Sequence, residues 1–256
     1  MAPYTKKQLG VLLTFLIFYA LLVFIAYTFL PPEQLRAPMQ TAPATVTTTP
    51  RWRTGLVQGG MVFVMFAPLG LAGYWFARQL GFPPIYRESA GWRRWFLWPM
   101  LLGLGVGVLL IVIDRLFVAW GAPMIPHPPF PFSLIASVSA AIGEEIIFRS
   151  FLMGLCAFLL NLLLKRRQAT QAALWGGNII AALLFGAGHL PAALMFLGVS
   201  SPLEIPPLIL AEVFLIGGLV SLVAGERYIR DGLVAAIGVH FWTDIVWHVI
   251  YPLIGG

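Results

Sequence analysis

Long apolar runs separated by short polar segments dominate the chain. Each run contains roughly 20 residues or more, the length that an α-helix needs to cross a hydrocarbon core of ~30 Å. The pattern predicts an all-α fold, a polytopic bundle of about seven (seven to eight) transmembrane helices. The runs are Leu9–Leu30, Leu56–Phe76, Phe96–Trp120, Phe132–Leu164, Ala172–Leu190, Pro207–Ala224 and Leu233–Tyr251.

Two of these runs have unusual lengths. A helix over Phe132–Leu164 would be ~50 Å long, so we expect it to tilt, to kink near Gly143 or to protrude into water. The run Leu9–Leu30 exceeds the ~7–15 apolar residues of a secretory signal, and we interpret it as an uncleaved anchor.

The basic residues between the runs predict the orientation of the bundle. Cytoplasmic loops of membrane proteins carry an excess of lysine and arginine. A cytoplasmic N-terminus places eleven basic residues inside and three outside, and seven crossings then put the C-terminus on the extracytoplasmic side. The eleven are Lys6, Lys7, Arg78, Arg87, Arg93, Arg94, Lys165, Arg166, Arg167, Arg227 and Arg230, and the three are Arg36, Arg51 and Arg53. The proline- and threonine-rich segment Pro31–Thr54 is then expected to be an irregular external connector.

Composition agrees with a membrane protein. The 256 residues are 59% hydrophobic and 10% charged, whereas about a quarter of the residues of a soluble domain are charged. The net charge of +6 does not indicate a nucleic-acid partner, because the basic residues punctuate the apolar runs. We expect a single integral membrane domain over residues 1–256, with three helices and their loops in 1–131 and the polar motifs in 132–256.

Three ionisable residues interrupt the fourth run. Each costs ~2.5–3.5 kcal/mol at the centre of a bilayer, and such residues are functional by default. Glu145 and Arg149 are an i, i+4 pair on one helix face and are expected to neutralise each other as a structural pair. Glu144 points elsewhere without a local partner, so it either stays protonated or faces a wet cavity.

The fifth run ends in a second polar position. His189 follows Phe185 by four residues, and Gly186 and Gly188 between them allow another helix or a ligand to approach the backbone closely. A lone histidine at a helix end is more often a capping or interfacial residue. A functional role for His189 is therefore supported only in combination with the polar residues of other helices.

The last run carries three ionisable residues at i, i+4 and i+8. His240, Asp244 and His248 therefore line one stripe of an apolar helix, which packing does not explain. Asp244 can orient one of the histidines by accepting its ring proton.

These motifs resemble those of the CAAX-protease and bacteriocin-processing family of intramembrane endopeptidases. The resemblance covers the C-terminal half, with E-E-x-x-x-R, F-x-x-x-H and H-x-x-x-D on separate predicted helices. It rests on Glu144, Glu145, Arg149, Phe185, His189, His240 and Asp244. It implies a helical membrane fold that encloses a hydrophilic cavity, and it implies hydrolysis of a peptide bond.

The resemblance also implies roles. Glu144 would be the general base that activates water, with His189 beside it, while His240 and Asp244 would polarise the scissile carbonyl and stabilise the oxyanion. Glu145, Arg149, Phe185 and His248 would support them. An ionised aspartate cannot donate a hydrogen bond, so Asp244 acts in protonated form, through His240, or as a metal ligand.

A zinc site is the main alternative to this mechanism. His189, His240 and Asp244 could hold zinc, with Glu144 as the base. The sequence has no H-E-x-x-H pair that fixes two ligands on one helix. We therefore favour a glutamate mechanism without metal or other cofactor.

Two further classes compete with a protease. A proton-coupled transporter also places carboxylates and histidines in the membrane, although the inverted repeats typical of transporters are missing from the sequence. A catalytically idle scaffold or immunity protein could keep the same bundle. The expected partners are the bilayer and a peptide or protein substrate, prenylated if the chain acts like the CAAX branch, and the oligomeric state is not specified.

The spacing of the motifs from the basic loops predicts the depth of the site. Glu144 lies ~31 Å of helix before Lys165, and Asp244 lies ~21 Å after Arg230. These depths place the site between the midplane and the extracytoplasmic boundary. The cavity is then expected to open laterally or toward that side, whereas a CAAX substrate would favour the cytosolic side.

Overall fold

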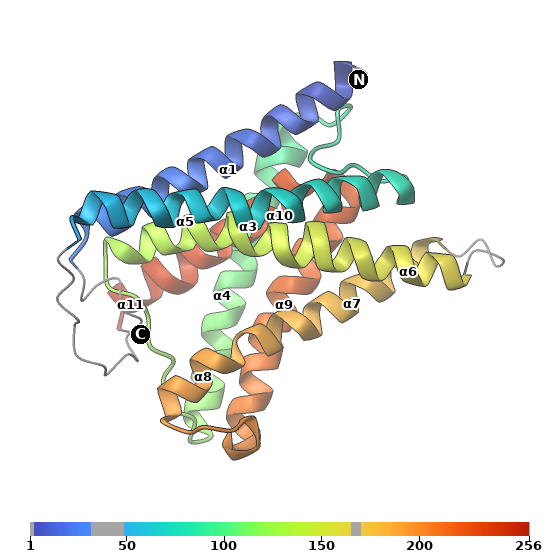
Figure 1. Ribbon diagram of the computed structural model, residues 1–256. Coiled ribbons are helices and arrows are strands. Elements are labelled where there is room, and N and C mark those ends of the chain that lie inside the picture. Colours follow the sequence, from blue (N-terminus) through green and yellow to red (C-terminus); the bar gives the residue numbers. More distant parts are fainter. Residues whose placement is uncertain (1–2, 32–48, 165–169, 256) are drawn as a thin grey trace.

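The computed structural model describes residues 3–31, 49–164 and 170–255 and is helical in every regular element of these ranges (Figure 1). Within these ranges, seven helical spans are long and apolar enough to cross a membrane, which confirms the predicted fold class. The spans are α1 (Pro3–Phe29), α3 (Arg51–Leu80), η1 (Arg93–Leu97) with α4 (Trp98–Ala119), α5 (Phe132–Glu144) with η2 (Glu145–Met153) and α6 (Gly154–Leu164), α7 (Thr170–Gly188) with α8 (Leu190–Leu197), α9 (Pro207–Asp231), and α10 (Leu233–Asp244) with η5 (Ile245–Ile250) and α11 (Tyr251–Leu253). A short 3-10 helix, η4 (Pro202–Glu204), lies between α8 and α9.

The helices extend beyond several predicted boundaries. Helix α3 begins at Arg51, inside the segment Pro31–Thr54 that the sequence predicted as irregular, and α9 continues from Ala224 to Asp231. Polar turns at helix ends can remain helical where the span leaves the hydrocarbon core, so an apolar run underestimates the helix. Residues 32–48 of the predicted connector and the basic residues Lys165, Arg166 and Arg167 lie outside the described residues.

The bundle exposes apolar side chains on its surface and buries polar side chains within an otherwise mainly apolar core. Large apolar side chains such as Leu21, Val64, Val108 and Leu183 are exposed on its surface. The interior, in contrast, contains buried polar and charged side chains: Gln8, Asp114, Ser133, Ser137, Glu145, Arg149, Ser150, Asn178, Glu212, Ser221, Asp231, His240, Thr243 and Asp244. This inversion of the soluble pattern is expected where lipid covers the surface.

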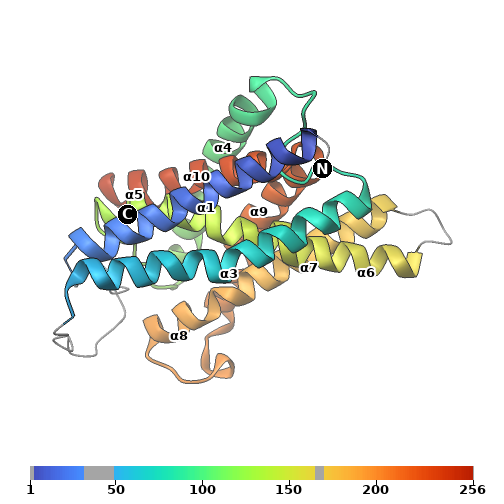
Figure 2. The ribbon, with the colours of Figure 1, turned by 45° about the horizontal axis from the view of Figure 1, so that its top comes forward.

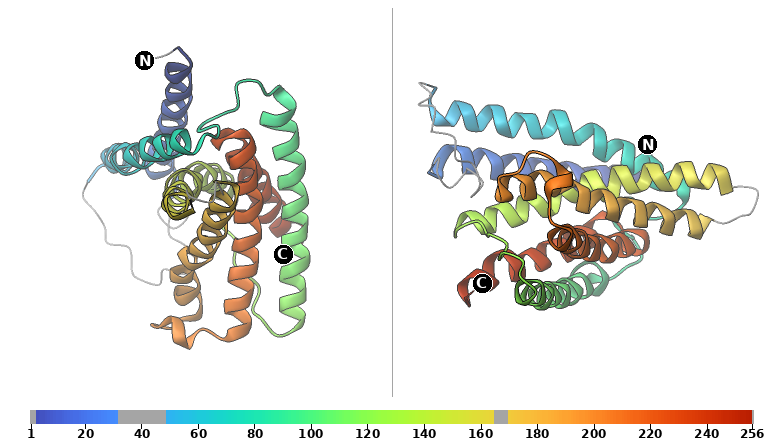
Figure 3. Two further views of the ribbon diagram at one scale, coloured as in Figure 1. Left: turned by 90° about the vertical axis from the view of Figure 1, so that its right-hand side faces the viewer. Right: turned by 90° about the horizontal axis from the view of Figure 1, so that it is seen from below.

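The last span occupies the centre of the bundle. In its most apolar window 56% of the residues are buried, against at most 33% in the other spans. Helix α10 packs against α4, α5, η2 and α9, while α1 packs on α3 and α7 packs on α6 and α9. Figures 2 and 3 show α1 and α3 side by side on one flank and α4 on another.

One end of the bundle holds a network of ion pairs and hydrogen bonds. The side chain of Gln8 donates to the carbonyl of Tyr86 at 2.7 Å and accepts from the amide of Ile85 at 3.0 Å. Asp231 of α9 pairs with Arg94 at 3.4 Å and with Arg227 at 3.2 Å. This network joins three segments of the chain: the N-terminal part of α1, the α3–η1 connection and the α9–α10 turn.

Glycines set the distance between α4 and α10. A Cβ atom at Gly103 would overlap the carbonyl oxygen of Val239 and the Cβ of Trp242, and one at Gly107 would overlap Val246. Small residues four positions apart allow two membrane helices to approach closely. The hydroxyl of Thr243 donates to the carbonyl of Gly103 at 3.2 Å across the same contact. This crossing positions the helix that carries His240 and Asp244.

We expect Gly103→Ala to destabilise the protein by about 1–3 kcal/mol, because the added methyl group meets backbone atoms that cannot turn aside. Gly105→Ala is the matched control, since nothing lies within 4 Å of its Cβ position and alanine favours the helix. Thermal unfolding in detergent measures both, and equal melting temperatures would contradict the close contact.

Candidate active site

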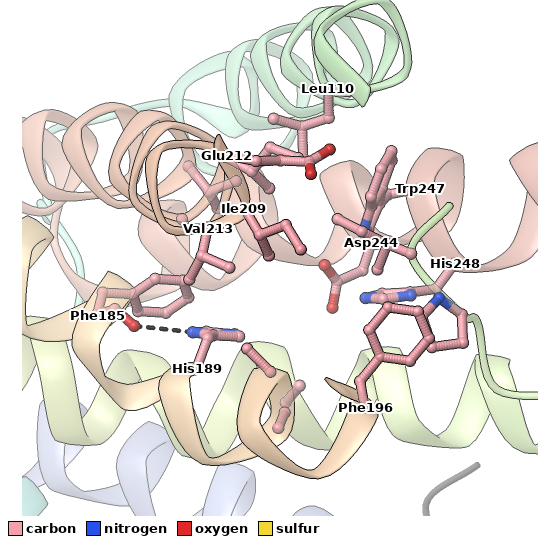
Figure 4. Close-up of a pocket in the computed structure, with 18 of the residues that line it drawn as sticks. Leu110, Phe185, His189, Phe196, Ile209, Glu212, Val213, Asp244, Trp247 and His248 are labelled. Atoms are coloured by element: carbon pink, nitrogen blue, oxygen red, sulfur yellow. Dashed lines mark hydrogen bonds between the residues drawn. The ribbon is translucent and has the colours of Figure 1, made fainter. Parts of the chain in front are cut away.

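A cavity of about 260 Å³ lies between α5, α7, α8, α9, α10 and the segment that joins α4 to α5. Its volume corresponds to roughly eight or nine water molecules of ~30 Å³ each. The chemically active side chains that line it are Glu144, His189, Glu212, His240, Asp244 and His248. The remaining wall is mainly apolar, with Leu110, Phe196, Ile209, Val213 and Trp247 among its members (Figure 4).

Glu145 and Arg149 form an ion pair with no exposed side-chain surface. Arg149 donates from Nε to Oε2 at 3.0 Å and from Nη2 to Oε1 at 3.2 Å, a two-pronged arrangement that suits a guanidinium. Its Nη1 donates to the hydroxyl of Ser221 at 2.5 Å, and its guanidinium carbon lies 5.0 Å from the ring centre of Phe185. The predicted i, i+4 pair is confirmed.

Glu145 has a second partner that the sequence did not indicate. Its Oε1 lies 3.0 Å from Nδ1 of His240 on α10. A carboxylate only accepts, so Nδ1 carries the hydrogen and the ring orientation is fixed. The other nitrogen, Nε2, then lies 3.9 Å from Oε2 of Glu144 and 3.6 Å from Oδ2 of Asp244. Glu145 is therefore more than a counter-ion of Arg149, because it also holds the imidazole of His240.

Glu144 remains without an arginine partner. Its side chain is 32% exposed and lines the cavity. Its Oε2 makes no hydrogen bond with any described residue. Glu144 thus lies at the cavity, which is one of the two alternatives that the sequence left open.

Phe185 and His189 adjoin the same centre. His189 occupies the break between α7 and α8, where its Nδ1 lies 2.8 Å from the carbonyl oxygen of Phe185. That carbonyl can only accept, so Nδ1 donates and Nε2 is the nitrogen available to the cavity (Figure 4). The ring of Phe185 packs against both imidazoles, at 4.8 Å from His189 and 5.7 Å from His240. Phe185 thus supports the two histidines and the guanidinium of Arg149.

The stripe His240, Asp244 and His248 faces the cavity as predicted. His248 also contacts His127 of the α4–α5 connection, with 3.1 Å between their Nδ1 atoms. Burial lowers the pKa of His127, which favours its neutral form. No sequence pattern predicts this contact, since the two histidines lie on different elements.

Both helices that carry the acidic motifs change their winding beside the cavity. The π-helical segment η2 begins directly after Glu144, and η5 begins directly after Asp244. Single π-helical turns within α-helices are frequent at functional sites because they re-aim side chains. The long fourth run is continuous through this change, which lies two residues after Gly143.

Two buried acids near the site were not predicted as site residues from the sequence. Glu212 lines the cavity, and Asp114 accepts a hydrogen bond from the hydroxyl of Tyr251 at 2.5 Å. Both are acidic residues inside apolar runs, so the rule that singled out Glu144 also applied to them.

The donors of the alternative zinc site are not gathered around one point. His240 and Asp244 are neighbours, but no three histidine, cysteine, aspartate or glutamate side chains within residues 3–31, 49–164 and 170–255 are arranged to hold a metal ion. The mechanism without metal stays a prediction.

Comparison with known proteins identifies one family. Residues 126–246 match the Rce1-like family, described as type II CAAX prenyl endopeptidase Rce1-like. The matched segment contains all three motifs, and the family resemblance predicted from them is confirmed. No curated protein and no solved structure matches the chain.

We expect Glu145→Gln to destabilise the fold by about 3–5 kcal/mol, because it leaves the buried guanidinium of Arg149 without its counter-charge. Glu204→Gln, an exposed change in η4, should stay within about 0.5 kcal/mol of the parent. Thermal unfolding in detergent compares the two variants. An unchanged melting temperature for Glu145→Gln would mean that the pair does not hold the bundle together.

Proposed function

We propose that this chain, whose residues 126–246 belong to the Rce1-like family of type II CAAX prenyl endopeptidases, cleaves a peptide bond with a water molecule activated by Glu144. The family match supports a CAAX-type intramembrane endopeptidase, and the proposal adds the base and the roles around it. The observation that carries it is the environment of Glu144, a cavity carboxylate with no arginine partner and with His240 beside it.

In this mechanism Glu144 removes a proton from water, and the hydroxide oxygen attacks the scissile carbonyl carbon. Glu144 then delivers the proton to the leaving amine as the carbon–nitrogen bond breaks. His189, whose Nε2 is free, holds the water or the amine in line with Glu144. No external reactant other than water is needed.

His240 supplies the stabilisation of the oxyanion. Its Nδ1 hydrogen is held by Glu145, so Nε2 can donate only when His240 is an imidazolium, and that second hydrogen would then serve the carbonyl oxygen on which charge develops. Asp244 lies 3.6 Å from this Nε2 and, when ionised, has no hydrogen to donate. Of the three roles open to Asp244, we therefore propose that it acts through His240 by favouring the imidazolium.

The substrate is proposed to be a peptide or protein segment that reaches the cavity from the membrane. Mainly apolar walls surround the polar centre, which suits an amphipathic or lipidated segment. The family name adds prenylated peptides as candidates.

We expect Glu144→Gln to abolish peptide cleavage while the melting temperature stays close to that of the parent, because Glu144 has no arginine partner and its Oε2 makes no hydrogen bond that the change would break. The assay incubates reconstituted protein with a peptide library that includes farnesylated and unmodified members, after exhaustive chelation of metals, and detects products by mass spectrometry. Glu204→Gln is the control and should keep full activity.

Cleavage by Glu144→Gln would rule out Glu144 as the base. Loss of parent activity on chelation, with recovery on added zinc, would replace the proposed mechanism by a metal-dependent one. No cleavage of any library member by the parent would favour the idle scaffold or the proton-coupled transporter.

We also propose that the cavity lies in the extracytoplasmic half of the membrane. It is lined by Pro123 and Ile125 of the α4–α5 connection, whereas Arg87, Arg94 and Arg227 gather at the end of the bundle where α9 meets α10. A basic end is expected to face the cytoplasm.

Cysteine labelling in intact cells tests this orientation. In a Cys156→Ala background, Ser200→Cys should react with a membrane-impermeant thiol reagent and Ser89→Cys should not, since the two exposed serines lie on opposite sides in this topology. The reverse pattern would turn the bundle over and place the cavity on the cytosolic side.

A further inference from the structure

The cavity contains an acid that belongs to none of the three motifs. Glu212 lies on α9 and lines the cavity together with Glu144, His240 and Asp244. Its side chain is 99% buried, with a relative exposure of 1%, and its Oε1 has no hydrogen-bond partner among the described residues. A carboxylate at this depth is costly unless a ligand or a partner satisfies it.

The position of Glu212 on its helix directs it into the cavity. Ile209, Glu212, Val213 and Ile216 all line the cavity and recur at helical spacing, so they form one face of α9. Figure 4 shows the Glu212 carboxylate across the open space from His189. It therefore faces the same space as the catalytic groups from another wall.

No cation of the protein satisfies this carboxylate. The residues that line the cavity include no lysine and no arginine. The buried guanidinium of Arg149 is already bound to Glu145 and Ser221. Arg115 of α4 instead donates to the carbonyl of Gly255 and lies over the ring of Tyr251.

A second acid on the neighbouring helix adds to the negative potential. Asp114 is fully buried one helical turn after Leu110, which lines the cavity, and α4 packs against α9. The Oδ2 of Asp114 accepts from Tyr251, while its Oδ1 has no partner in the described part of the chain. Glu212 thus presents an unsatisfied oxygen to the cavity, Asp114 adds a second one behind Leu110, and no lysine or arginine lines the cavity.

We infer that Glu212 is a specificity-determining residue that receives a cationic group of the substrate, a lysine or arginine side chain near the scissile bond. This inference rests on the proposed peptidase function. Lysine and arginine carry a charge at the end of an apolar stem. The cavity offers the complementary arrangement, since Leu110, Val213 and Ile216 line it with apolar surface together with the carboxylate of Glu212.

Matched peptides test the inference once the library has yielded a cleaved sequence. Among the cleaved library peptides, the position closest to the scissile bond at which lysine or arginine is enriched is identified first. Two versions of one cleaved peptide are then made that differ only at this position, where one has lysine and the other has norleucine. We expect the parent to prefer the lysine peptide by about tenfold or more in kcat/KM, mostly through KM, as a charge-assisted contact would produce. Glu212→Gln should lose this preference and cleave the norleucine peptide at the parent kcat.

The outcomes separate the inference from the proposed function. No cleavage of any peptide by the parent overturns both. Cleavage without enrichment of lysine or arginine, or a lysine preference that survives in Glu212→Gln, overturns the inference alone. An equal loss of kcat on both peptides would show a structural role and would also overturn it. Should Glu212→Gln fail to fold, Glu212→Asp keeps the charge and must retain the preference, with Glu204→Gln as the unchanged control.

Discussion

The buried ion pair between Glu145 and Arg149 is the constraint on which the rest of the site depends. Removing two charges from water costs several kcal/mol per ion, so the pair is tolerable only when its remaining hydrogen-bonding groups are satisfied. Arg149 meets this need with Ser221 of α9 and the ring of Phe185 of α7, and Glu145 meets it with His240 of α10. One salt bridge on η2 thus holds three other helices at fixed positions.

The same ion pair places the two adjacent glutamates in different environments. Glu145 is bound to Arg149 and His240, whereas Glu144 points in another direction, into the cavity. In the proposed mechanism, Glu145 therefore orients the imidazole of His240 while Glu144 exchanges a proton with water.

Local rules predicted much of this from the sequence, and long-range contacts limited the rest. Run length predicted the seven spans, and i, i+4 spacing predicted the contact of Glu145 with Arg149. The contacts of His240 with Glu145 and of His127 with His248 join residues 95 and 121 positions apart, which periodicity does not encode. The π-helical segments also depend on packing around the site. The glycines of α4 and the acid Glu212 did carry local signals, small residues at a four-residue spacing and a charge in an apolar run.

The acidic side chains at the basic end of the bundle have ion-pair partners, whereas acids in the cavity lack hydrogen-bond partners. This difference supports the cavity as the functional site. At the basic end, Glu226 pairs with Arg227 of its own helix and Asp231 pairs with Arg94 of η1, so the acids there have partners within the protein. In the cavity, Glu144 and Glu212 each keep an oxygen without a hydrogen-bond partner among the described residues. A buried carboxylate oxygen without a hydrogen bond lowers stability unless another group satisfies it. In the proposed function, water and substrate enter the cavity and supply these missing hydrogen bonds.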